Sequence, residues 1–153
     1  MPNHEKVHWE NAYSVGIKDI DKQHKKLFEL VNKLYDLNDN ANIKEEIRDI
    51  LYAFSDYTKV HFKDEEDYMK SISYPELEKH KEIHERIVES LSNIIHTPAT
   101  LNIVKSKMRV VAKRVLIEHI VNEDFKIGLY AREHKAKAEI YNLDDEDVEN
   151  RVL

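Results

Sequence analysis

The chain of 153 residues contains no cysteine. Disulfides, thiolate metal sites and iron–sulfur clusters are therefore excluded, and any bound metal must take nitrogen and oxygen ligands. Only two glycines and three prolines occur, which leaves little material for tight hairpins or for a glycine-rich loop that cradles phosphates. The composition favours a protein without β-hairpins and without a phosphate-binding loop.

Long apolar runs and an excess of basic residues are also absent. No run approaches the roughly 18–20 residues that cross a bilayer, and the N-terminal region lacks an apolar signal segment. The net charge is −6, and no basic stripe is present that would neutralise phosphates. We therefore expect a soluble, cytoplasmic and monomeric protein with neither a membrane nor a nucleic acid as partner.

The residues that are present predict an all-α fold. A hydrophobic fraction of 41% and a charged fraction of 35% suit a small helical bundle, and the length suits a single domain. Apolar residues recur every three or four positions in four segments, which end at turn or cap residues: about 19–37, 43–72, 76–95 and 98–134. Short connections between them predict an antiparallel up-down-up-down four-helix bundle.

The two ends of the chain lie outside this periodic region. Residues 1–18 are expected to form an N-terminal arm, 19–134 the bundle, and 135–153 an acidic C-terminal tail with six acidic and three basic side chains. The tail is consistent with either a short docked helix or a solvated segment. Gly128 falls inside the fourth segment, where glycine costs about 1 kcal/mol, and a close helix approach is the expected reason.

Histidines and carboxylates lie on the inward stripes of all four helical segments. A single histidine on an apolar stripe is more often a hydrogen-bonded core residue than a ligand. Here, however, five histidines and two carboxylates lie on these stripes: His24; His61 and Glu65; His80 and His84; His119 and Asp124. Without a metal each unmet imidazole would cost about 1–3 kcal/mol, and each unpaired carboxylate more. Seven ligands are too many for one ion, so they predict two ions with carboxylates placed to bridge. Iron, zinc and copper all suit these donors.

The spacing within the fourth segment is irregular. His119 and Asp124 are five residues apart, or about 140° around a regular α-helix. Glu123, four residues after His119, would be the regular partner. Either Asp124 approaches the cluster from the side, or the helix contains a local π-type turn.

These residues resemble the hemerythrin family, in particular its single-domain bacterial members. The similarity covers about residues 7–134 and rests on the following strings: Asp21-Lys22-Gln23-His24, His61-Phe62-Lys63-Asp64-Glu65-Glu66, Tyr74-Pro75 before His80-x-x-x-His84, and His119-Ile120-Val121-Asn122-Glu123-Asp124. The resemblance implies a non-haem di-iron centre that binds O2 reversibly.

The resemblance also implies a role for each ligand. One iron would be held by three histidines and be coordinatively closed: His80, His84 and His119. The other would be held by two and keep one position free for O2: His24 and His61. The two irons would share an oxide or hydroxide and two bridging carboxylates: Glu65 and Asp124.

The expected function is O2 carriage, storage or delivery, without enzymatic turnover. Leu116, one turn before His119, is the main candidate for lining the O2 pocket, with plain core packing as the alternative; Trp9 and Ile120 are further candidates. The competing functions are an O2 or redox sensor that acts through a separate protein partner, and a slow di-iron oxidase or peroxidase. Histidine-rich ligation with one free position favours O2 binding over substrate oxidation.

Overall fold

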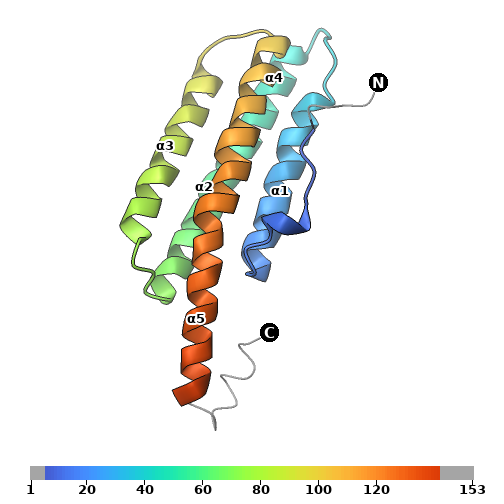
Figure 1. The fold of residues 1–153 in the computed structure, drawn as a ribbon. Helices are drawn as coiled ribbons and strands as arrows, with labels where there is room; N and C mark the ends of the chain where they lie inside the picture. The colour runs from blue at the N-terminus through green and yellow to red at the C-terminus, as the bar shows by residue number, and fades with distance from the viewer. Residues whose placement is uncertain (1–5, 142–153) are drawn as a thin grey trace.

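The computed structural model describes residues 6–141, of which 135–141 are described as backbone only. Three regular helices come first: α1 (Lys18–Tyr35), α2 (Ile43–Ser71) and α3 (Leu77–His96). A fourth rod runs antiparallel to α3 and completes the bundle. Figure 1 shows that the chain runs up, down, up and down, which confirms the predicted architecture. Within the described residues no helix is both long enough and apolar enough to cross a membrane.

The fourth rod is one continuous helix of changing pitch. It consists of α4 (Leu101–Val110), the π-helical segments η2 (Val111–Ile117) and η3 (Ile120–Asp124), and α5 (Phe125–Tyr141). Its start at Leu101 differs from the expected start at residue 98, because Thr100 is the extended N-cap and its hydroxyl accepts the Ile103 amide at 3.4 Å.

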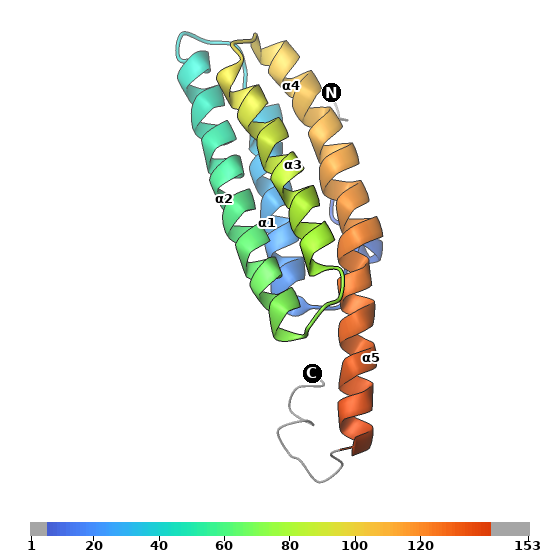
Figure 2. The ribbon, with the colours of Figure 1, turned by 90° about the vertical axis from the view of Figure 1, so that its left-hand side faces the viewer.

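At its other end the fourth rod continues beyond the expected boundary at residue 134. α5 projects past the ends of the other helices, as Figures 1 and 2 show. The backbone of residues 135–141 therefore belongs to this helix, and the acidic segment 142–153 lies outside the described residues.

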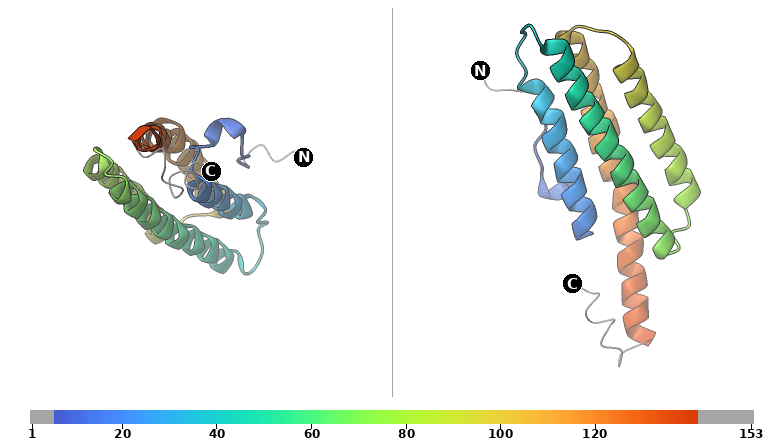
Figure 3. Two further views of the ribbon diagram at one scale, coloured as in Figure 1. Left: turned by 90° about the horizontal axis from the view of Figure 1, so that it is seen from below. Right: turned by 180° about the vertical axis from the view of Figure 1, so that it is seen from behind.

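Two apolar clusters of unequal size fill the interior. α2 lies beside both α1 and α3, and the end-on view in Figure 3 shows the fourth rod closing the bundle. The larger cluster includes Leu27 and Leu34, and burial of a side chain of this kind stabilises the fold by roughly 1.5–3 kcal/mol. The smaller cluster consists of Met69, Tyr74 and Ile127, near the end of α2 and the start of α5.

The N-terminal arm is tied to α1 and to the fourth rod. Its short 3-10 helix η1 spans Asn11–Tyr13. The Val7 amide donates to the Asn32 side chain, and the Asn32 amide donates back to the Val7 carbonyl, both at 2.8 Å. Asp21 accepts hydrogen bonds from the Ser14 hydroxyl at 2.5 Å and the Val15 amide at 2.8 Å.

Gly128 is needed because this arm crosses the fourth rod. A Cβ atom at position 128 would lie 1.8 Å from the Val15 carbonyl oxygen. The sequence correctly indicated a close approach at this glycine, but the approaching segment is the arm and not another helix. The backbone carbonyl of Val15 occupies the space that a side chain at position 128 would fill.

Candidate metal centre

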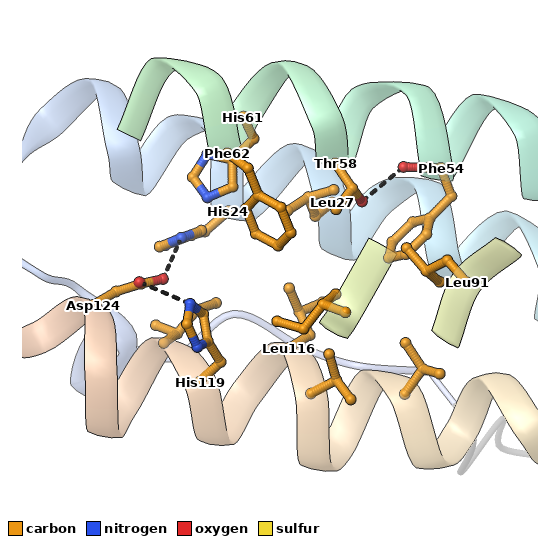
Figure 4. A pocket seen from close by; sticks show the side chains of 14 residues that line it. His24, Leu27, Phe54, Thr58, His61, Phe62, Leu91, Leu116, His119 and Asp124 are labelled. Carbon is orange, nitrogen blue, oxygen red and sulfur yellow. Dashed lines mark hydrogen bonds and ion pairs between the residues drawn. The ribbon is translucent and has the colours of Figure 1, made fainter. Parts of the chain in front are cut away.

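The seven candidate ligands converge from all four rods. His24 comes from α1, His61 and Glu65 from α2, His80 and His84 from α3, and His119 and Asp124 from the fourth rod. All seven are buried, with Glu65 completely inaccessible. Figure 4 shows four of them facing one another across the interior: His24, His61, His119 and Asp124.

The ligand atoms form two overlapping groups, and within each group the atoms lie within 4.8 Å of one another. The first group contains three histidines: His80, His84 and His119. The second contains two: His24 and His61. Both groups include the same two carboxylates, Glu65 and Asp124.

Each shared carboxylate divides its two oxygens between the groups. Glu65 Oε1 lies 2.9 Å from His80 Nε2 and 3.0 Å from His84 Nε2, whereas Oε2 lies 3.3 Å from His61 Nε2. Asp124 shows the same division, with Oδ1 facing the three-histidine group and Oδ2 lying 3.1 Å from His24 Nε2. Carboxylates in this arrangement are placed to bridge two ions.

The fourth rod brings His119 and Asp124 together through a π turn. Segment η3 covers Ile120–Asp124, directly after His119. The turn is wider than an α turn, so a residue five positions on reaches the same face. This decides between the two alternatives left open by the spacing. Asp124 Oδ1 lies 3.1 Å from His119 Nε2, and Glu123 takes no part in either donor group.

The centre holds a concentration of polar atoms that the protein leaves unsatisfied. Among the side chains that the structure describes, seven buried atoms have no partner in hydrogen-bonding geometry, and all belong to these ligands: both ring nitrogens of His24, Nε2 of His84 and of His119, Glu65 Oε2, and both oxygens of Asp124. Buried polar atoms without partners are costly and rare. A pair of cations between the ligands would satisfy all of them except the outward Nδ1 of His24, so the donor set fits two metal ions.

Electrostatic coupling within the cluster is strong. Burial lowers the pKa of His80, but hydrogen bonds and charges from Asp124 and Glu65 outweigh it and raise the pKa to about 10. The same opposition raises the pKa of His24 to about 9. In Glu65 burial alone would raise the pKa, yet hydrogen bonds from the surrounding imidazoles hold it well below its ordinary value. In the metal-free protein, protons on the imidazoles of His24 and His80 therefore supply positive charge at the centre.

Two outer residues orient the ligands, and sequence reasoning did not single them out. Gln23 Oε1 accepts a hydrogen bond from His61 Nδ1 at 2.7 Å, and Glu66 Oε2 accepts one from His84 Nδ1 at 2.7 Å. Both contacts join neighbouring helices, so periodicity within one helix gives no signal for them. Their positions next to His24 and Glu65 in the chain are the only hint.

A small apolar cavity adjoins the two-histidine group. Its free volume is about 20 Å³, which is enough for one water molecule or one diatomic gas molecule. All four rods supply apolar walls, among them Leu27, Phe54, Ile87 and Leu116. Thr58 also lines it, and its hydroxyl donates to the Phe54 carbonyl at 2.8 Å, as Figure 4 shows.

The three pocket candidates from the sequence have different positions. Leu116 and Ile120 both line the cavity beside His119. Trp9 does not, contrary to the expectation. Its ring packs against Phe28 at 5.7 Å and Tyr13 at 5.9 Å between centroids, which ties the arm to α1. The Lys25 ammonium lies 5.2 Å from the same ring. Trp9 therefore stabilises the arm at a distance from the ligands.

The fold and the centre together define a two-metal-binding four-helix bundle, and comparison with known proteins identifies its family. The family model described as Hemerythrin HHE cation binding domain matches residues 15–131. Bacteriohemerythrin of Campylobacter jejuni is 34% identical over 125 residues, which are 81% of this chain and 94% of the relative. Myohemerythrin of Theromyzon tessulatum is 35% identical over 122 residues, or 80% and 91% of the two chains. Bacteriohemerythrin of Clostridium acetobutylicum is 36% identical over 88 residues, covering 56% and 68%.

The chain belongs to the hemerythrin family. This confirms the resemblance found in the sequence, and with it the expected O2-binding function and the di-iron cofactor.

Proposed function

We propose that the protein binds O2 reversibly, for carriage, storage or delivery, at two irons held by the seven clustered side chains. The three-histidine group would hold one iron: His80, His84 and His119. The two-histidine group would hold the other: His24 and His61. The two carboxylates would bridge them: Glu65 and Asp124. When bound, the two ferrous ions supply the electrons that make O2 binding possible.

The division of the carboxylate oxygens is the observation that carries this assignment. Each oxygen of Glu65 and of Asp124 faces a different histidine group, so each carboxylate has one donor for each ion. The first group then has five protein donors and the second has four. An ion with fewer donors would keep room for an added ligand, and the apolar cavity is lined by both histidines of this group but, of the other group's histidines, only by His119.

The cavity walls support binding rather than turnover. A free volume of about 20 Å³ with mainly apolar walls suits a diatomic gas better than a larger or polar substrate. Leu116 and Ile120 would exclude water next to the free position, and Phe62 would shield the imidazole of His84, on which it stacks at 3.7 Å between centroids. We therefore propose a carrier and not an enzyme. A monomeric state and a cytoplasmic location remain further predictions from the sequence.

The central experiment adds O2 to the reduced, iron-loaded protein. We expect a visible charge-transfer absorption band that appears with O2 and disappears under vacuum through several cycles. Iron analysis of the same sample should give two ions per chain. Irreversible conversion to the ferric form together with consumption of an added reductant would instead favour the oxidase or peroxidase alternative.

A pair of histidine variants tests the ligand assignment. His119→Ala removes one of three imidazoles from its iron, so the purified protein should contain fewer than two irons per chain. His96→Ala is the matched control, because His96 is exposed and bonds only within its own helix turn. Two irons per chain in the His119 variant would remove this residue from the ligand set.

A further inference from the structure

We infer that the two metal positions have graded affinity, and that Glu66 and Gln23 act as positioning residues that set the difference. The three-histidine position would fill first and retain its ion, whereas the ion at the two-histidine position would exchange. This inference rests on the proposed di-metal site, but it concerns how each position holds its ion.

The first argument is the number of donors. The group around His80, His84 and His119 contains five donor residues, and the group around His24 and His61 contains four. Because the two groups share both carboxylates, the whole difference is one imidazole. An ion in the second group therefore makes one bond fewer to the protein.

The second argument is the charge behind each group. His84 directs its Nδ1 at the Glu66 carboxylate, 2.7 Å away. A carboxylate behind a ligating imidazole raises its basicity and strengthens its bond to the metal. Hydrogen bonds to an ionised acceptor are also roughly twice as strong as neutral ones. The three-histidine position thus has an additional negative charge in support.

The two-histidine position has only neutral support. His61 directs its Nδ1 at the Gln23 amide oxygen, also at 2.7 Å, and the Gln23 amide nitrogen donates onward to Asp64 at 2.7 Å. This fixes the orientation of the ring without placing a charge against it. His24 Nδ1 is buried and has no hydrogen-bond partner among the residues that the structure describes. Neither ligand of this ion has a carboxylate hydrogen-bonded to its Nδ1 atom, as His84 has.

Ring packing acts in the same direction. The His84 imidazole stacks on Phe62 with an interplanar angle of 4° and a centroid separation of 3.7 Å. His61 meets the same phenyl ring only at 5.7 Å and at a 46° tilt. The His84 ring is therefore held by a stack and a charged hydrogen bond together, so little reorganisation is needed when its ion binds.

The experiment titrates the metal-free full-length protein with Co2+, followed by absorption and calorimetry. We expect two resolved steps in the unmodified protein. Glu66→Gln should weaken the tighter step by about 10- to 100-fold, the usual effect of removing an outer partner, and leave the weaker step unchanged. Gln23→Glu should strengthen the weaker step and bring the two closer together. Gln23→Leu should weaken that step alone.

Asp67→Asn provides the matched control for Glu66→Gln. Asp67 lies in the same acidic run but pairs with Lys63 at 2.9 Å on the surface. It should change neither step. A purely structural role for Glu66 would weaken both steps equally and lower the unfolding temperature of the metal-free protein, and that result would overturn the inference.

A measurement on the unmodified protein makes the test independent of the variants. When the protein carrying two ions is mixed with excess chelator, half of the metal should leave rapidly and half slowly. Loss of both ions at one rate, or a single binding step for two ions, would overturn the grading and leave the di-metal site intact. Failure to bind two ions at all would instead contradict the proposed function.

Discussion

α2 and the fourth rod each place one histidine and one carboxylate at the centre, but they do so with different backbones. In α2, His61 and Glu65 are four residues apart on a regular α-helix. In the fourth rod, His119 and Asp124 are five apart, and the π turn of η3 makes up the difference. The two pairs of side chains reach equivalent positions. The backbone of the fourth rod therefore departs from α-helical geometry where it places its ligands, whereas the backbone of α2 does not.

The comparison shows how much support each rod needs from the rest of the structure to hold its pair of ligands in place. A regular helix presents i and i+4 on one face whatever surrounds it. A π turn is rare and is mostly found at functional sites, so it needs support from the rest of the structure. The fourth rod has that support on both sides, from the ligands of the other helices and from the arm, whose Val15 carbonyl lies against Gly128.

Single-residue deletions should have the largest effect, because they change the spacing between histidine and carboxylate in each rod. Deleting exposed Asn122 should close the π turn into an α turn, leaving Asp124 four residues from His119 and still on the ligand face. Deleting exposed Lys63 from α2 should rotate Glu65 by about 100° around the helix axis, out of its position between the two histidine groups. We expect iron to be retained in the first variant and lost in the second. Iron analysis and circular dichroism would measure this, and equal loss in both would contradict it.

Gly128→Ala should reverse the usual effect of alanine in a helix. In a regular helix this substitution gains about 1 kcal/mol. Here the new Cβ would meet the Val15 carbonyl oxygen at 1.8 Å, so the arm must move. We expect a net loss of about 2–3 kcal/mol, as for an overpacked core. Urea unfolding would measure the loss. The fluorescence of Trp9, the single tryptophan, would report displacement of the arm.

The pH dependence of stability should differ between metal-free and metal-loaded protein. The pKa values of His24 and His80 are raised to about 9 and about 10, so their contribution is present below 6.5 and disappears as the pH rises through 9–10. Glu65 has a lowered pKa, and its contribution disappears in acid below its ordinary 4.5. The metal-free protein should therefore be most stable between pH 4.5 and 6.5.

Metal loading should move this maximum toward higher pH. The ligands must lose their protons to bind metal, so the added stability grows as the pH rises. Thermal unfolding of both forms across the pH range would measure the shift. A common maximum for the two forms would contradict the role of these imidazoles as proton holders in the metal-free centre.

The last two substitutions compare the two rods where they face the cavity. Leu116→Ala, in η2, should cost about 2–4 kcal/mol and speed autoxidation several-fold, because water gains access to the centre. Thr58→Val, in α2, keeps the shape and removes only a hydroxyl that bonds within its own helix. It should change stability by less than about 1 kcal/mol and slow autoxidation. Decay of the O2-dependent absorption band would measure both rates, and the opposite order would contradict the assigned positions.

Most of the bundle could be predicted because regular helices carry their own periodic pattern. The inward stripes of α1, α2 and α3 depend on spacing alone, and so do the pairs His61–Glu65 and His80–His84. The start of the fourth rod was misplaced because two threonines, at positions 97 and 100, precede it in the chain. Only the extended backbone of Thr100 and its bond to Ile103 distinguish them.

The composition and spacing of this chain determined an all-α bundle with seven inward donors, because each depends on local geometry that repeats every few residues. The tertiary structure alone decided the π turn at Asp124, the division of each carboxylate between two groups, and the positions of Gln23 and Glu66 behind His61 and His84. It also decided that Val15, rather than a helix, approaches Gly128. Each of these depends on contacts between segments distant in the chain, and no periodic pattern records such contacts.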